Sequence, residues 1–376
     1  MGNFSVNDPQ LTEPYDAILV VSFGGPEAPG EVLPFLENVL RGRNVPRERM
    51  LQVAHHYDLF GGVSPINGQN RALIAALERE LAASDLKLPV YWGNRNWHPL
   101  LADTLRQMRA DGRRRALAFV TSAYSSYSGC RQYREDIERA REAVGEGAPQ
   151  VDKLRVFYNH PGFIAPNVEN LQAALAEIPA DRRDTAHVAF TAHSIPLSMA
   201  ANCDYQAQLS ETCRLVAEGA GHARWQLVFQ SRSGSPAQPW LEPDICDHLR
   251  ALKASGATDV LVAPVGFISD HMEVLYDLDT EARQVADEIG INLVRAATVG
   301  THPTFIEMIR DLIVERQTCT SLRPALGTRG AKEDVCPADC CLMGAAAAGR
   351  PAAVATTTTA QAPHTARPAS TNERPA

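Results

Sequence analysis

The sequence has no uninterrupted apolar run that approaches the roughly 20 residues needed to span a bilayer. Its polar start, "MGNFSVNDPQ", has neither the basic region nor the apolar region of a secretory signal. A basic excess is missing as well, because 36 Lys and Arg stand against 44 Asp and Glu, for a formal net charge of -8. Binding to nucleic-acid phosphates is therefore not expected. We expect a cytoplasmic protein without a transmembrane segment, whose partner is small or metallic.

Several catalytic motifs are absent too. Neither an HExxH zinc motif nor a GxSxG nucleophile elbow occurs, which argues against a zinc protease and a serine hydrolase. The stretch "SFGGPEAPGEV" (22–32) has glycines after an apolar run, but their spacing matches neither GxGxxG nor a Walker A loop. A tight turn is the simpler interpretation, and nucleotide binding is not supported.

The chain does contain a regular alternation of apolar runs and helical patterns. Runs of about five to eight apolar residues are typical of buried parallel strands, and they lie at 16–23, 88–93, 115–122, 154–158, 187–192, 225–230, 259–267 and 292–296. Helical periodicity is found at 70–83, 99–112, 205–221 and 274–290. Because four strands, a gap and four more strands follow one another, we predict an α/β fold of two Rossmann-like domains. Each would be a parallel four-stranded sheet flanked by helices, with a ligand cleft between the domains.

A chain of 376 residues also exceeds what one hydrophobic core usually serves. The last stretch has no bulky periodic residues and cannot bury enough surface to become ordered. We expect a flexible N-terminus (1–14), an N-terminal α/β domain (15–178), a C-terminal α/β domain (179–318), a cysteine-bearing extension (319–343) and a disordered tail (344–376).

The sharpest candidate residue is His193, where the apolar run in "HVAFTAHSIP" stops. Glu273, Asp277 and Glu281 recur every four residues just after another strand, so they lie along one side of a helix at the cleft. Stacked carboxylates repel one another, and cations would offset that repulsion. A solvated acidic face is the simpler alternative. An imidazole and these carboxylates could instead converge on a metal ion, or act as bases in proton abstraction.

Cysteines form a second candidate group. In a chain of this length without a signal peptide they indicate thiols or metal ligands rather than a disulfide framework. Cys336, Cys340 and Cys341 lie together in "VCPADCC", which suits zinc or an iron and sulfide cluster. A fourth ligand must come from elsewhere in the fold, and the candidates are Cys130, Cys203 and Cys319.

Seven stretches between about Tyr15 and Arg316 together match one known family: "SFGGP", "FLENVLRGR", "FGGVSPING", "TAHSIP", "FQSRSG", "PWLEPD" and "SDHMEVLYDLD". Through them the sequence closely resembles ferrochelatase, specifically the actinobacterial type that acts on coproporphyrin III. The resemblance implies an enzyme of heme biosynthesis, a lyase that inserts ferrous iron into a porphyrin held between two domains of the chelatase type. A protoporphyrin IX ferrochelatase, a cobalt or nickel chelatase, and a non-catalytic tetrapyrrole or metal carrier stay open as alternatives. Transient contact with neighbouring heme-pathway enzymes is a further expectation.

The resemblance also implies roles for single residues. His193, as proton acceptor, and Glu273 flank the porphyrin centre, and Asp277 and Glu281 continue the metal-facing acidic line. The positions that match porphyrin or propionate contacts are Ser64, Tyr133, Arg41 and Arg43. A [2Fe-2S] cluster is implied on Cys130, Cys336, Cys340 and Cys341, with Cys130 preferred as the internal ligand because of its position.

Two departures from the family pattern limit what is carried over. Phe23 stands where relatives often have a tyrosine that can approach the metal, and Phe cannot ligate. "GNRNWHP" differs from a Lys-His pair of some relatives, so no metal or acid-base role is assigned to Arg95 and Asn96.

Overall fold

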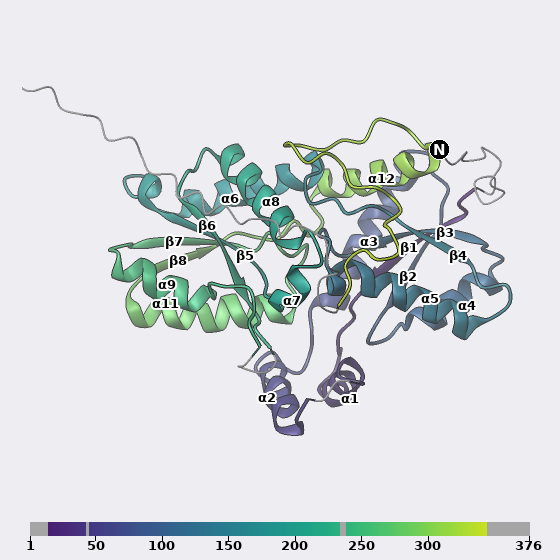
Figure 1. The fold of residues 1–376 in the computed structure, drawn as a ribbon, viewed down its shortest axis with the longest axis horizontal. Helices are drawn as coiled ribbons and strands as arrows, with labels where there is room; N and C mark the ends of the chain where they lie inside the picture. Colours follow the sequence, from purple (N-terminus) through teal and green to yellow (C-terminus); the bar gives the residue numbers. More distant parts are fainter. Residues whose placement is uncertain (1–13, 43–44, 234–237, 344–376) are drawn as a thin grey trace, which may run out of the picture.

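The structure, a computed structural model, describes residues 14–42, 45–233 and 238–343. Two parallel four-stranded sheets lie side by side (Figure 1), in the strand orders β2-β1-β3-β4 and β6-β5-β7-β8. The strands are β1 (Ala17–Ser22), β2 (Val90–Asn94), β3 (Arg115–Val120), β4 (Gln150–Lys153), β5 (His187–His193), β6 (Trp225–Gln230), β7 (Asp259–Ala263) and β8 (Asn292–Arg295). The identical strand order in both sheets confirms the predicted doubled α/β fold. The predicted flexible N-terminus (1–14), apart from Pro14, and the predicted disordered tail (344–376) lie outside the described residues.

Helices flank both sheets. The α-helices are α1 (Val32–Val39), α2 (Arg47–Asp58), α3 (Ile66–Ala83), α4 (Leu101–Ala110), α5 (Gln132–Val144), α6 (Pro161–Glu177), α7 (Leu197–Ala200), α8 (Tyr205–Ala220), α9 (Ile245–Ala254), α10 (Met272–Val274), α11 (Arg283–Ile289) and α12 (Pro303–Thr318). Two π-helices are labelled η3 (Tyr127–Arg131) and η5 (Leu275–Ala282). Among the described residues, no helix is both long and apolar enough to cross a membrane.

The predicted strand at 154–158 is wrong, because β4 ends at Lys153. Leu154 still donates to the carbonyl of Ala118, but the next residues leave the sheet. Phe157 and Tyr158 are buried against the helices in the core rather than in a ladder. An apolar run shows burial, and here helix packing accounts for the burial without a strand.

The helices that end each half pack across the boundary between them. α6, which follows the first sheet, packs on α8, whereas the last helix, α12, packs on α3 beside the first sheet (Figure 1). Phe305 of α12 contacts Phe119, Phe157 and Phe163. One hydrophobic cluster therefore contains residues from both halves. The division at residues 178 and 179 stays a prediction, since these helices join the two sheets into one packed unit.

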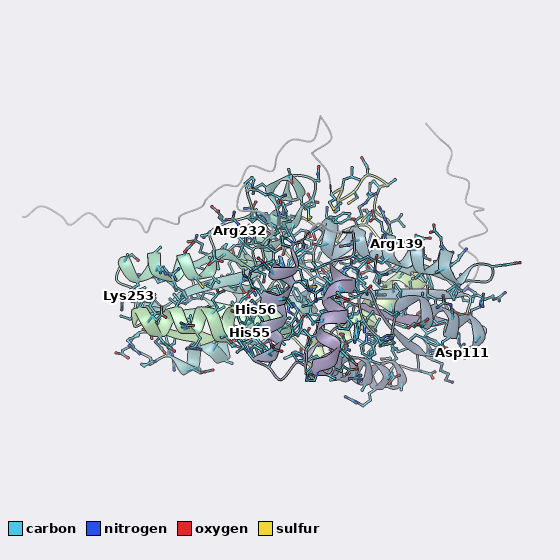
Figure 2. All side chains as sticks on the ribbon, turned by 90° about the horizontal axis from the view of Figure 1, so that it is seen from below. His55, His56, Asp111, Arg139, Arg232 and Lys253 are labelled. Carbon is cyan, nitrogen blue, oxygen red and sulfur yellow. The ribbon has the colours of Figure 1, made fainter. Side chains whose placement is uncertain are left out.

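Both π-helices occupy equivalent places, after the third strand of each half. η3 leads into α5, and η5 continues α10 into α11, so the predicted helix at 274–290 is only partly α-helical. The i→i+5 bonding of a π-helix is rare and frequently occurs at functional sites. α1 and α2 project from the body, and seen from below they lie across the middle of the molecule (Figure 2).

Candidate active site

His193 is the last residue of β5, at the carboxyl edge of the second sheet. Its Nε2 lies 3.8 Å from Oε2 of Glu273, and the side chains are 33% and 52% exposed. Its Nδ1 contacts the carbonyl oxygen of Ser194. Because a carbonyl oxygen can only accept, Nδ1 carries the proton in the neutral ring and Nε2 keeps its lone pair. A solvent-accessible basic nitrogen is thus presented beside a carboxylate.

The acidic line follows from α10 into η5 rather than along one α-helix. Glu273 and Glu281 are exposed, whereas Asp277 between them is buried. Burial raises the pKa of Asp277 to about 7, a hydrogen bond from Ser231 opposes the rise, and the charge of Glu273 adds to it. The charges of Glu273 and Glu281 both raise the pKa of Asp277, as expected for neighbouring carboxylates on one side of a helix.

The first-domain residues implied in porphyrin contact come from separate elements. Ser64 is buried just before α3, and a Cβ on Gly25 would lie only 2.7 Å from the Ser64 Cβ, so only glycine permits this approach. Tyr133 is buried in the first turn of α5, and Arg41 is exposed in the turn after α1. Arg43 lies outside the described residues.

Arg95, to which the sequence analysis assigns no metal or acid-base role, packs against Tyr133. Its guanidinium lies over the Tyr133 ring, 4.5 Å from the centroid, and 5.8 Å from that of Phe23. It is also ion-paired with Asp136 of α5. Arg95 thereby connects the end of β2 to the loop after β1 and to the start of α5, and so holds Tyr133 in place.

Helix α2 reaches from the first half onto the acidic line. The ring of His56 stacks on Tyr276 of η5 with centroids 3.6 Å apart and planes 9° from parallel. Figure 2 shows His55 and His56 on the side of α2 that faces the second half. Tyr57 is buried, and its pKa is raised by burial and by the charge of Glu273. α2 therefore contacts the segment that carries the acidic line.

Four thiols meet beside η3 and the end of β4. The Cys130 thiol is hydrogen-bonded to Cys336, and Cys336 to Cys340. The Cys340 and Cys341 sulfurs are 3.3 Å apart, and Lys153 Nζ donates to the Cys130 sulfur over 2.9 Å. The thiols form a row, and in the described part of the chain no group of three or more His, Cys, Asp or Glu side chains is arranged to hold a single metal ion.

The other two candidate thiols do not join this row. Cys203 lies 3.4 Å from the carbonyl of Met199, and exposed Cys319 lies 3.8 Å from that of Arg316. Arg131, next to Cys130 in η3, donates to the carbonyl of Cys340 over 2.9 Å. The preference for Cys130 therefore agrees with where the extension returns to the body.

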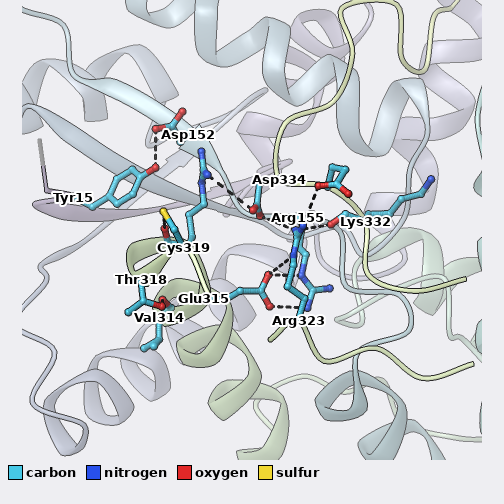
Figure 3. A network of polar contacts seen from close by, with 12 residues as sticks. Tyr15, Asp152, Arg155, Val314, Glu315, Thr318, Cys319, Arg323, Lys332 and Asp334 are labelled. Carbon is cyan, nitrogen blue, oxygen red and sulfur yellow. Dashed lines mark hydrogen bonds and ion pairs between the residues drawn. The ribbon is translucent and has the colours of Figure 1, made fainter. Parts of the chain in front are cut away.

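A buried polar network holds the extension against the body (Figure 3). Arg155 donates to both carboxylate oxygens of Glu315 over 2.6 and 2.9 Å, with side chains 0% and 6% exposed. Arg323 of the extension donates to the same Glu315 and pairs with Asp334. Lys332 reaches Asp204 at the start of α8 over 2.5 Å. The extension, as far as the structure describes it (319–343), thus contacts both halves.

The stretch "FQSRSG" (229–234) entered the sequence analysis only through the family resemblance, and no role was given to Gln230 and Ser231. Gln230 Nε2 donates to the Glu273 carbonyl over 3.2 Å and to Asp277 over 3.3 Å, and the Ser231 hydroxyl donates to Asp277. A polar pair at the end of a buried strand, Gln230 as its last residue and Ser231 directly after it, was the available signal. Its direction toward the acidic line depends on sheet register, which one sequence does not reveal.

Comparison with known proteins shows to which family the chain is similar. The ferrochelatase family model matches residues 15–317. A ferrochelatase of Rhodopirellula baltica is 60% identical over 330 residues, which cover 88% of this chain and 94% of the relative. A coproporphyrin III ferrochelatase of Streptomyces coelicolor is 54% identical over 363 residues, covering 90% and 96%. One from Mycolicibacterium smegmatis is 52% identical over 304 residues, covering 80% and 89%. The chain therefore belongs to the ferrochelatase family.

Proposed function

We propose that this protein inserts ferrous iron into coproporphyrin III to give Fe-coproporphyrin III, as a cytoplasmic step of heme biosynthesis. The observation that carries the proposal is the pair of His193 Nε2 and Glu273 Oε2, 3.8 Å apart at the carboxyl edge of the second sheet. A base beside a carboxylate, with further carboxylates behind it, suits a reaction that removes protons and supplies a divalent cation.

Metallation requires two pyrrole N–H protons to leave as the ion enters the ring. Nε2 of His193 has the free lone pair to take one proton, and the Glu273 carboxylate stabilises the imidazolium that forms. The second proton passes to water, and His193 later releases its proton to water as well. Asp277 and Glu281 lie along the path by which a partly hydrated ferrous ion would approach. Oxygen ligands release such an ion, whereas thiolates would retain it. The reaction is therefore assigned to the imidazole and the carboxylates.

Binding energy must also distort the planar macrocycle so that its nitrogen lone pairs meet the ion. We assign this task to the first-domain wall, with Ser64 and Tyr133 against the ring and Arg41, together with Arg43, near propionates. Guanidinium groups match carboxylates in geometry and charge. The Arg95 contacts that fix Tyr133 support this assignment.

The choice of porphyrin rests on relatives. Those from Streptomyces and Mycolicibacterium bear the name coproporphyrin III ferrochelatase, whereas the Rhodopirellula relative bears only the name ferrochelatase. Coproporphyrin III has propionates where protoporphyrin IX has vinyl groups, so a cationic wall favours the former. Iron supply and product transfer would involve transient contact with neighbouring enzymes of the pathway.

We further propose that Cys130, Cys336, Cys340 and Cys341 hold a [2Fe-2S] cluster. The donor set fits, because four adjacent thiols without a carboxylate are what such a cluster requires. A row of thiols suits two irons better than one ion, which needs ligands around a single point. When bound, the cluster supplies one-electron redox chemistry and a covalent staple between η3 and the extension. Since insertion of ferrous iron is redox-neutral, no step is routed through the cluster.

The test is anaerobic incubation with Fe(II) and either coproporphyrin III or protoporphyrin IX, following porphyrin absorbance. We expect metallation with a higher kcat/KM for coproporphyrin III. A preference for protoporphyrin IX would refute the proposed substrate but would leave the proposed ferrochelatase activity intact. Binding of both porphyrins without any metallation would identify a carrier instead.

A further inference from the structure

The backbone turns sharply where β6 ends. Ser231 has φ +61°, a left-handed conformation that is uncommon for residues other than glycine. Only three other described non-glycine residues share it, and they are Asp85, Cys319 and Cys341. Strain of this kind persists where surrounding contacts determine it, and it clusters at functional sites. Here the contacts are those made by Ser231 with the acidic line.

Gln230 and Ser231, named here the β6 corner, connect both sides of the proposed site. Gln230 is 1% exposed and pairs in register with His193, and its carbonyl accepts from Ser194 N over 2.8 Å. Its side chain donates to the Glu273 carbonyl over 3.2 Å. One residue is therefore bonded on one side to the strand end that carries the base, and on the other to the helix that carries the first carboxylate.

The corner also fixes Asp277. Gln230 Nε2 and the Ser231 hydroxyl both donate to the same oxygen, Oδ2. Hydrogen bonds to an ionised acceptor are roughly twice as strong as neutral ones, and two on one oxygen define one orientation of the carboxylate. A buried carboxylate without such donors would turn away from the line or lose its charge.

From these contacts we infer that Gln230 and Ser231 are positioning residues for metal delivery, holding Asp277 in line between Glu281 and Glu273. This inference rests on the proposed function, and it adds that the orientation of Asp277 is imposed from β6 rather than by η5 alone. Neither residue needs to touch iron or porphyrin. The alternative is a turn residue that serves stability only.

Two substitutions of Ser231 separate these possibilities. Ser231→Gly keeps the left-handed backbone without strain and removes the hydroxyl, whereas Ser231→Ala removes the hydroxyl and keeps the strain. If the hydroxyl positions Asp277, both variants weaken Fe(II) binding and raise the KM for Fe(II) by about tenfold, the size expected for a lost hydrogen bond to a charged group. Porphyrin affinity stays unchanged, although the glycine variant is the more stable of the two.

The measurements are anaerobic calorimetry with Fe(II) alone, steady-state kinetics, porphyrin fluorescence quenching and thermal unfolding, on the cluster-loaded protein. Asp85→Gly is the matched control, because it relieves the strain of the same left-handed backbone conformation (φ +55°) after the end of α3, at a residue outside the proposed site. In an Asp277→Ala background, Ser231→Gly should cause no further loss, since the side chain that accepts from Ser231 is gone.

Wild-type Fe(II) affinity and KM in Ser231→Gly would overturn the inference, and so would an equal additional loss in the Asp277→Ala background. Calorimetry keeps this test separate from that of the proposed function. Absence of metallation by the wild type would refute the proposed ferrochelatase activity. The Fe(II) affinity of the variants tests the positioning role of the β6 corner whether or not the protein is active.

Discussion

Replacing Asp277 by asparagine is expected to stabilise the folded protein at and above neutral pH while impairing iron delivery. Burial raises the pKa of this carboxyl from 3.8 to about 7. Below about pH 4 the group is protonated in both the folded and the unfolded chain and adds no pH dependence. Between about pH 4 and 7 only the unfolded chain loses the proton, so stability falls as pH rises.

The size of the effect follows from that shift. From 3.8 to about 7 is about three pKa units, and at about 1.4 kcal/mol per unit the folded state loses about 4 kcal/mol by pH 8. Because pH 5 lies about one unit above the unfolded pKa, the folded state has lost less than about 2 kcal/mol at that pH. Asparagine keeps an oxygen that can accept from Ser231 and Gln230 but has no charge to bury.

The assay is urea unfolding of wild type and Asp277→Asn at pH 5 and pH 8 in metal-free buffer, with Fe(II) affinity measured in parallel. We expect the variant to be more stable by about 2 to 4 kcal/mol at pH 8, and by less at pH 5. A substitution that removes an unfavourable buried charge from a functional site commonly raises stability and lowers activity. Equal or lower stability of the variant at pH 8 would refute the reasoning.

Three other predictions concern single groups. His193→Ala should lower the insertion rate by about 10²- to 10⁴-fold, the usual contribution of a general base, while fluorescence quenching shows intact porphyrin binding; near-normal turnover would remove His193 from the chemistry. Cys341→Ser should lose the visible absorption of the cluster and Cys319→Ser should retain it, whereas a purified wild type without iron and sulfide would exclude the cluster. Glu315→Gln should destabilise the protein by about 3 to 5 kcal/mol, because it leaves the Arg155 charge buried and unpaired; proteolysis near residue 318 should accelerate, and an unchanged unfolding midpoint would contradict the importance of this pair.

The alternation of strands and helices was readable because burial and periodicity are local signals. β6 was predicted with its observed limits, and β5 to within one residue. The run at 154–158 misled because helix packing buries apolar residues as a strand does. The packing of α12 beside the first sheet was not foreseen, since a helix's partner depends on the tertiary fold and not on its own periodicity.

Part of the candidate site was also readable. Both His193 and the stretch that begins with Glu273 follow parallel strands of one sheet, whose carboxyl ends share an edge, so their proximity follows from topology. Cys130 could be favoured over Cys203 and Cys319 because it follows the predicted strand at 115–122. The π-helical form of η5 and the left-handed Ser231 could not be predicted, because each depends on contacts between segments distant in sequence.

The central claim is that the protein performs metallation and does not merely bind its ligands. A single-turnover experiment tests it most directly: the anaerobic protein, saturated with coproporphyrin III, is mixed with Fe(II), and the porphyrin absorbance is followed in time. We predict rapid conversion of the bound porphyrin to Fe-coproporphyrin III, far faster than in the absence of protein. Bound coproporphyrin III that remains metal-free for as long as porphyrin in buffer would contradict the claim.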